Sequence, residues 1–178
     1  IDGAVDMAST LQVDGAITSS SAATITVADN SYTLTLLSTD TDASSGPNIR
    51  LKRDSSSPAD DDFTGIIYFQ AENDAGEETD YQRITTRIRD ASDGSEDGQL
   101  TLSSMVAGTL RNRLEFNEAE AVFNDDSVDV NFRVESDGNA NMLFVDGGND
   151  RLGIGTATPA FTFDLQKSLS ESYSASGR

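Results

Sequence analysis

The chain has 178 residues, a formal net charge of −19 and 36% apolar residues, and it contains neither cysteine nor histidine. Without these two residue types, disulfides and the Ser-His-Asp and Cys-His forms of catalysis are excluded. The negative field disfavours nucleic acid and anionic membranes as partners, and no apolar run approaches the roughly 20 residues that span a bilayer. The low apolar content favours a thin molecule or a core shared between chains.

Residues 1–22 carry a short repeat, because Ile1-Asp2-Gly3-Ala4-Val5 returns as Val13-Asp14-Gly15-Ala16-Ile17. Two short strands with tight turns cannot bury a face without neighbours. We therefore expect this segment to be a β-ribbon shaft in which three copies of the chain wind about one axis. Because the sequence begins with isoleucine and not methionine, we also expect the chain to be processed or cut from a longer polypeptide.

Residues 23–123 show the alternation of apolar and polar residues that is typical of strands with one buried face. Asp-Gly, a strong tight-turn signal, occurs six times in the chain. Strands are predicted near residues 23–27, 32–38, 48–53, 64–71, 80–89, 98–103, 110–116 and 120–123. Short strands with turn-rich connections predict an all-β fold, an antiparallel β-sandwich-like domain flanked by β-rich shaft segments.

Residues 124–166 are predicted to form a second β module or shaft segment. A strand near residue 132 runs to a turn at Ser136-Asp137-Gly138, and strands follow at 141–145 and 151–154. The stretch Gly153–Pro159 breaks regular structure before residues 161–165 alternate once more. The Ser-rich residues 167–178 are expected to be a linker to a C-terminal region that lies beyond this chain.

The segment Phe132–Pro159, with its Gly-Ile-Gly-Thr-x-x-Pro stretch, resembles the tail fibre proteins of bacteriophages, especially marine ones. The stretches Asp54–Asp60 and Asp90–Thr109 are similar to the same proteins. The resemblance implies a homotrimeric, β-rich structural protein of the virion, which is extracellular, contacts other virion proteins and contributes to host adsorption. It carries over no catalytic site.

Acidic loops supply the candidate metal ligands. If residues 48–116 form a simple meander, the loops Asp54–Asp62 and Asp90–Asp97 lie at one end of the domain, and Glu72–Asp80 lies at the other. Calcium binds six to eight oxygens from such flexible loops. The candidate calcium ligands are Asp60, Asp61, Asp62, Asp90, Asp93 and Asp97. The alternative is that these carboxylates are only solvated, and no other cofactor is predicted.

Arginines gather on predicted strands, with Arg87 and Arg89 on one face of residues 80–89, and Arg111 and Arg113 together on a later strand. Guanidinium groups suit carboxylates, so ion pairs with the acidic loops or a neighbouring protomer are expected. Binding of an anionic host-surface glycan is the functional alternative. Paired carboxylates can hydrolyse glycosides, but the chain has no Trp and only 7% aromatic residues, so we expect no enzyme.

The sequence therefore predicts a non-enzymatic fibre segment that works as a spacer or adsorption element. The alternatives are a carbohydrate-binding module at a fibre tip and a subunit of a bacterial extracellular adhesin or filament. The residues expected to fill the core or the trimer axis are Leu36, Ile49, Leu51, Ile66, Tyr68, Ile84, Ile88, Leu102, Leu114, Phe116, Phe132, Val134, Leu152 and Ile154.

Overall fold

A computed structural model describes residues 13–44 and 46–166 and divides the chain into two units, residues 1–50 and residues 51–178. The second unit holds two β-sheets, and the described residues contain no helix, which confirms the predicted all-β class. No helix long and apolar enough to cross a membrane occurs in this described part. Part of the repeat in residues 1–22 and the predicted linker 167–178 lie outside the described residues.

The described part of the first unit forms no strand, so the strands predicted at 23–27, 32–38 and 48–53 are wrong for a single chain. A strand needs a ladder of backbone hydrogen bonds with a neighbour, and none of the ladders in residues 13–44 and 46–166 includes these segments. Their apolar side chains stay exposed, as Leu36 (47%) and Ile49 (71%) show. The sequence alternates here, but the part of the chain that the structure describes supplies no strand that pairs with these segments.

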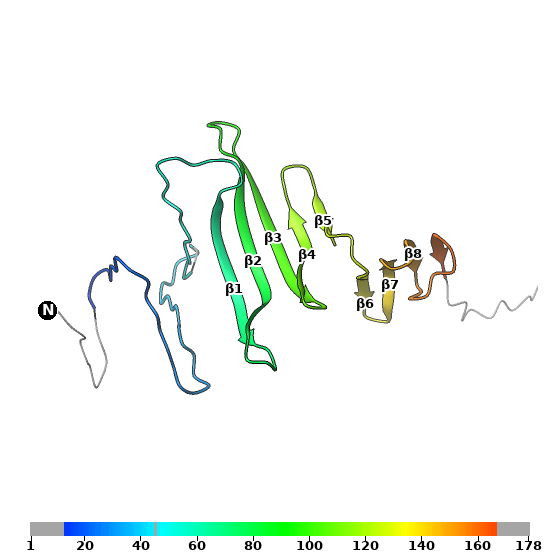
Figure 1. The fold of residues 1–178 in the computed structure, drawn as a ribbon, viewed down its shortest axis with the longest axis horizontal. Helices are drawn as coiled ribbons and strands as arrows, with labels where there is room; N and C mark the ends of the chain where they lie inside the picture. The colour runs from blue at the N-terminus through cyan, green and yellow to red at the C-terminus, as the bar shows by residue number, and fades with distance from the viewer. Residues whose placement is uncertain (1–12, 45, 167–178) are drawn as a thin grey trace, which may run out of the picture. The chain divides into compact units, whose positions relative to one another are not determined.

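The larger sheet is an antiparallel meander of five strands in chain order (Figure 1). Its strands are β1 (Phe63–Glu72), β2 (Glu78–Asp90), β3 (Asp97–Val106), β4 (Thr109–Phe116) and β5 (Ala121–Phe123). The predicted strands from residue 64 onward are confirmed. The fold differs from the expected sandwich because the described residues between 23 and 53 contribute no strand to a second layer.

Tight turns fix the register of the meander. Ala107 and Gly108 both have positive φ, 47° and 78°, between the paired residues Val106 and Thr109. This is the two-residue turn whose twist matches antiparallel strands, and glycine adopts it without strain. The turn between β1 and β2 is held by Asn73, whose Oδ1 accepts hydrogen bonds from the amides of Ala75 (3.0 Å) and Glu77 (2.9 Å).

The smaller sheet contains four strands, β6 (Phe132–Ser136), β7 (Asn139–Asp146), β8 (Arg151–Ile154) and β9 (Phe163–Leu165). The pairs β6–β7 and β7–β8 are antiparallel and are joined by the predicted turns, whereas β8 and β9 are parallel. The Gly153–Pro159 stretch returns the chain for this parallel pairing, and Arg151 Nη1 donates a 2.9 Å hydrogen bond to the carbonyl of Pro159.

Burial in one chain is slight, because Phe144 is the only buried hydrophobic residue in the described ranges. Of the residues predicted to fill the core or trimer axis, eight are half-buried and the others are exposed. The exposed ones are Leu36, Ile49, Leu51, Tyr68, Phe116 and Val134. Each sheet therefore lacks the second apolar layer that normally completes a β domain.

Candidate functional site

The candidate functional surface is the uncovered apolar face of the larger sheet. One apolar side chain from every strand stands in a continuous row across it: Ile67, Ile84, Leu102, Leu114 and Phe123. Directly paired residues of antiparallel strands point to the same face, so this row is a single stripe. Ile67 is 42% exposed and Phe123 is 52% exposed at its two ends.

The smaller sheet has an apolar face of its own. The register places eight apolar residues on one face: Phe132, Val134, Leu143, Val145, Leu152, Ile154, Phe163 and Leu165. Phe163 and Leu165 are 60% and 66% exposed. The rings of Phe123 and Phe132 lie 4.6 Å apart, so the last strand of the larger sheet contacts the first strand of the smaller one. Such clustered exposed apolar surface marks an interaction site.

The loops around residues 54–62 and 90–97 meet at one end of the larger sheet, as the meander predicts. The amide of Ala91 donates a 2.9 Å hydrogen bond to the Asp60 carboxylate. The amide of Asp61 and the carbonyl of Ile88 are joined at 2.9 Å, and the amide of Ile88 reaches the carbonyl of Asp62 at the same distance. The Asp60 carboxylate thus connects the two loops, and main-chain hydrogen bonds attach the first loop to Ile88 near the end of β2.

Two acidic residues of this end, Asp61 and Asp62, form ion pairs with arginines. Asp61 pairs with Arg89 and lies 3.7 Å from Arg87, and Asp62 pairs with Arg53 at 3.0 Å. These ion pairs agree with the predicted role of Arg87 and Arg89. Arg111 similarly lies 3.7 Å from Asp126.

The structure does not gather the six predicted metal ligands into one cluster. Asp90 and Asp97 face each other as the pair that starts the β2–β3 ladder, and Asp93 lies in the exposed turn between them. In residues 13–44 and 46–166, no group of three or more acidic side chains is arranged to hold a metal ion. Calcium binding remains a prediction from the sequence.

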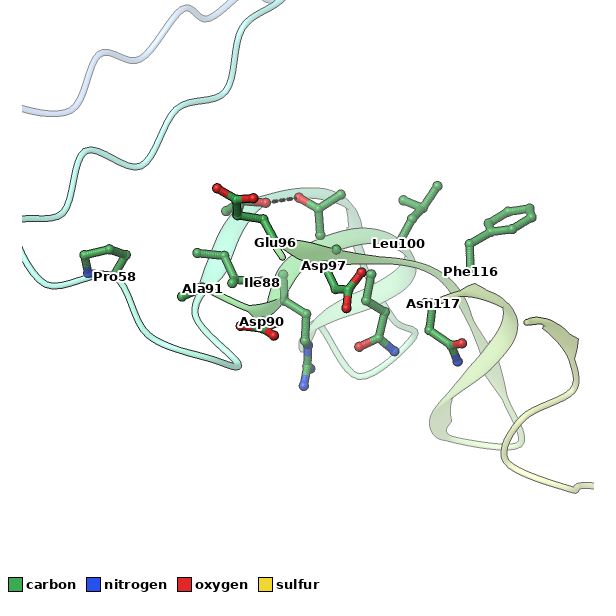
Figure 2. Close-up of a pocket in the computed structure, with 14 residues that line it drawn as sticks. Pro58, Ile88, Asp90, Ala91, Glu96, Asp97, Leu100, Phe116 and Asn117 are labelled. Carbon is green, nitrogen blue, oxygen red and sulfur yellow. Dashed lines mark hydrogen bonds between the residues drawn. The ribbon is translucent and has the colours of Figure 1, made fainter. Parts of the chain in front are cut away.

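A hollow of about 720 Å³ opens at this end of the sheet (Figure 2). Leu100 and Phe116, which pair in register, project from one side of the sheet, whereas Asp97 and Asn117 project from the other. Pro58 stands across from them on the preceding loop. The hollow thus joins an apolar wall, continuous with the apolar face, to a carboxylate rim.

The pKa of Asp90 predicts how the loop after β2 responds to pH. The Ser92 hydroxyl, and then the Ser92 amide at 2.8 Å, lower the pKa of Asp90 below the usual aspartate value. A depressed carboxylate pKa stabilises the fold above the unfolded-state pKa, and this contribution is lost as pH falls through the folded-state value. We expect the Ser92 and Ser95 amide resonances to keep their positions from pH 7 to 5 and to shift only in strong acid. Movement near pH 6 would contradict this assignment.

The sequence places arginines on the polar face of the larger sheet but does not indicate that hydroxyl side chains are buried there. Thr85, Thr101 and Ser103 are 5%, 8% and 2% exposed, so they are buried although none is apolar. All three share a face with Arg83 and Arg87. The alternation of the sequence could have shown that Thr85 belongs to this face, because every second residue of a strand points to the same side and residues 83, 85, 87 and 89 of β2 are all polar.

The fold and surfaces define an all-β protein with two sheets, each apolar on one uncovered face. No family model, curated protein or solved structure matches the chain.

Proposed function

We propose that the chain is a structural segment of a bacteriophage fibre, in which three copies associate through their apolar sheet faces. The observation that carries the proposal is the stripe from Ile67 to Phe123, together with the apolar face of the smaller sheet, since neither is covered in one chain. Fully burying one such side chain contributes about 1.5–3 kcal/mol, so covering both faces would be a large gain.

Other copies of the same chain are the partners that best explain the unpaired segments. Residues 23–38 alternate like strands and leave Ile25 and Leu34 60% and 61% exposed. In a parallel assembly, each such segment meets an identical segment at the same height, which provides both backbone partners and apolar neighbours. The missing second layer of the predicted sandwich would then come from another protomer. The resemblance to phage fibres favours three copies.

The proposed role is mechanical and adhesive, at the surface of a virion and in contact with other virion proteins. Three identical chains per fibre repeat every weak external contact and convert it into avidity. The net charge of −19 per chain would lie mainly on the outside and limit aggregation between fibres.

Light scattering coupled to size exclusion tests the proposal directly. We expect a particle of three times the 18.9 kDa chain mass at micromolar concentration. The same run with EDTA tests calcium, because a trimer that dissociates only after chelation would place metal between the acidic loops. A compact monomer would overturn the fibre proposal and favour a solitary binding module.

A further inference from the structure

A small polar hollow lies on the opposite face of the larger sheet, away from the apolar stripe. Its volume is about 230 Å³, and its lining includes Arg83, Thr85, Arg87, Thr101, Ser103 and Asn112. These side chains come from three adjacent strands, and the register pairs Arg83 with Ser103 and Thr85 with Thr101. The sheet itself therefore holds the group rigidly, without help from a loop.

Two polar atoms of this hollow have no hydrogen-bond partner although they are shielded from solvent. They are Nε of Arg83 and Oγ1 of Thr85, and Thr85 as a whole is only 5% exposed. Within the described ranges, Arg83 makes no ion pair, whereas Arg87 and Arg89 on the same strand both approach Asp61. An unsatisfied buried donor is costly, so adjacent donors left open on a rigid sheet point to a ligand.

The surrounding groups define the ligand's chemistry. A guanidinium binds a carboxylate or sulfate through two parallel hydrogen bonds, and the Thr85 hydroxyl supplies a third donor. Glu115, which also lines the hollow, supplies acceptors for hydroxyl groups. Tyr68 pairs with Arg83 in the register and is 49% exposed, so an aromatic ring stands on the same face beside the cation.

We propose that this hollow binds the acidic group of a saccharide, a carboxylate or a sulfate, with the sugar ring beside Tyr68. The volume is below that of sites for drug-sized molecules and accommodates one sugar unit. The site deepens the proposed fibre function and rests on it in one respect. If the apolar faces are buried between protomers, the polar faces point outward, and a fibre carries three copies of the site.

The test uses the full chain and three probes: glucuronic acid, inorganic sulfate and neutral glucose. Chemical-shift titration should show saturable, millimolar binding of glucuronic acid, with the Arg83 and Thr85 amides among those that move. Glucose should bind at least tenfold more weakly. Sulfate that competes with glucuronic acid would assign the shared oxyanion position, and binding should weaken as salt rises.

Variants separate this site from general charge effects. Arg83→Gln should lower glucuronic acid affinity at least tenfold, whereas Arg133→Gln, which removes an equal charge from an exposed arginine of β6, should leave it unchanged. Thr85→Val should also weaken binding without lowering the melting temperature, because it removes a hydroxyl that has no partner.

The outcomes also distinguish the two proposals. A trimer that binds neither glucuronic acid nor sulfate, or equal losses in Arg83→Gln and Arg133→Gln, would overturn the saccharide site and leave the fibre proposal standing. A monomer that binds glucuronic acid through Arg83 would support the site and overturn the fibre. If Arg83→Gln instead dissociates the trimer, the partner of Arg83 is a neighbouring protomer and the saccharide site is wrong.

Discussion

Ile67→Asp is expected to convert the assembled protein into monomers that keep their β structure. Ile67 stands at the end of the apolar stripe, pairs with Ile84 and is 42% exposed, so one chain tolerates a polar group there. In an assembly, the same change places three carboxylates in an apolar interface. The lost burial is about 1.5–3 kcal/mol per side chain, which weakens a trimer at least about a thousandfold. Light scattering measures the mass, and circular dichroism reports the strands.

Ile66→Asp is the matched control, because Ile66 is the adjacent residue of β1 and points to the polar face, opposite Thr85. Both variants add the same charge to the same strand and carry the same penalty in strand propensity. Only Ile67→Asp should change the mass. Equal dissociation in the two variants would mean that strand damage is responsible, and an unchanged mass in both would remove the apolar stripe from the interface.

The strand positions from residue 63 onward follow from alternation and turn signals, but the face of β1 does not. Both Ile66 and Tyr68 were predicted to lie in the core with Ile84 and Leu102. The register instead puts them on the polar face, and Ile67 and Phe69 take the apolar one. All four residues from 66 to 69 are apolar, so the pattern alone does not show which face of β1 is the apolar one. Only pairing with β2, where Ile84 alternates with Arg83 and Thr85, settles the orientation.

The other differences between the predicted and the observed structure share one physical cause. Each depends on which residues pair with each other, and the alternation of apolar and polar residues does not specify that pairing. Alternation at residues 23–38 and 48–53 predicts strands that the structure does not contain, because a strand exists only when a neighbour accepts its hydrogen bonds. Likewise, the acidic loops were correctly predicted to meet, but the carboxylates of Asp61 and Asp62 face arginines. The parallel β8–β9 pair depends on the short connection between these strands. The Gly-Ile-Gly-Thr stretch predicts a break in regular structure there but not the direction of the next strand.

Gly155→Ala is expected to detach β9 from β8, because the segment that connects these two strands requires glycine at this position. Gly155 has φ of 79°, and a Cβ at this position would meet the main-chain carbonyl oxygen of Gln166. The left-handed conformation and the clash together should cost roughly 2–4 kcal/mol. The local reporters are the amides of Leu152 and Gln166, which donate 2.8 Å hydrogen bonds to the carbonyls of Thr162 and Ile154. Their hydrogen exchange should accelerate by about thirtyfold or more.

Gly138→Ala provides the comparison within the same sheet. Gly138 lies in the turn between β6 and β7, its φ is outside the left-handed region, and no atom lies within 4 Å of an added Cβ. Alanine there should be neutral or slightly stabilising, because it restricts the unfolded chain. If both variants exchange alike, the return does not depend on Gly155. If only Gly155→Ala opens the β8–β9 pair and also lowers the mass of the assembly, Phe163 and Leu165 of β9 belong to the surface that joins the protomers.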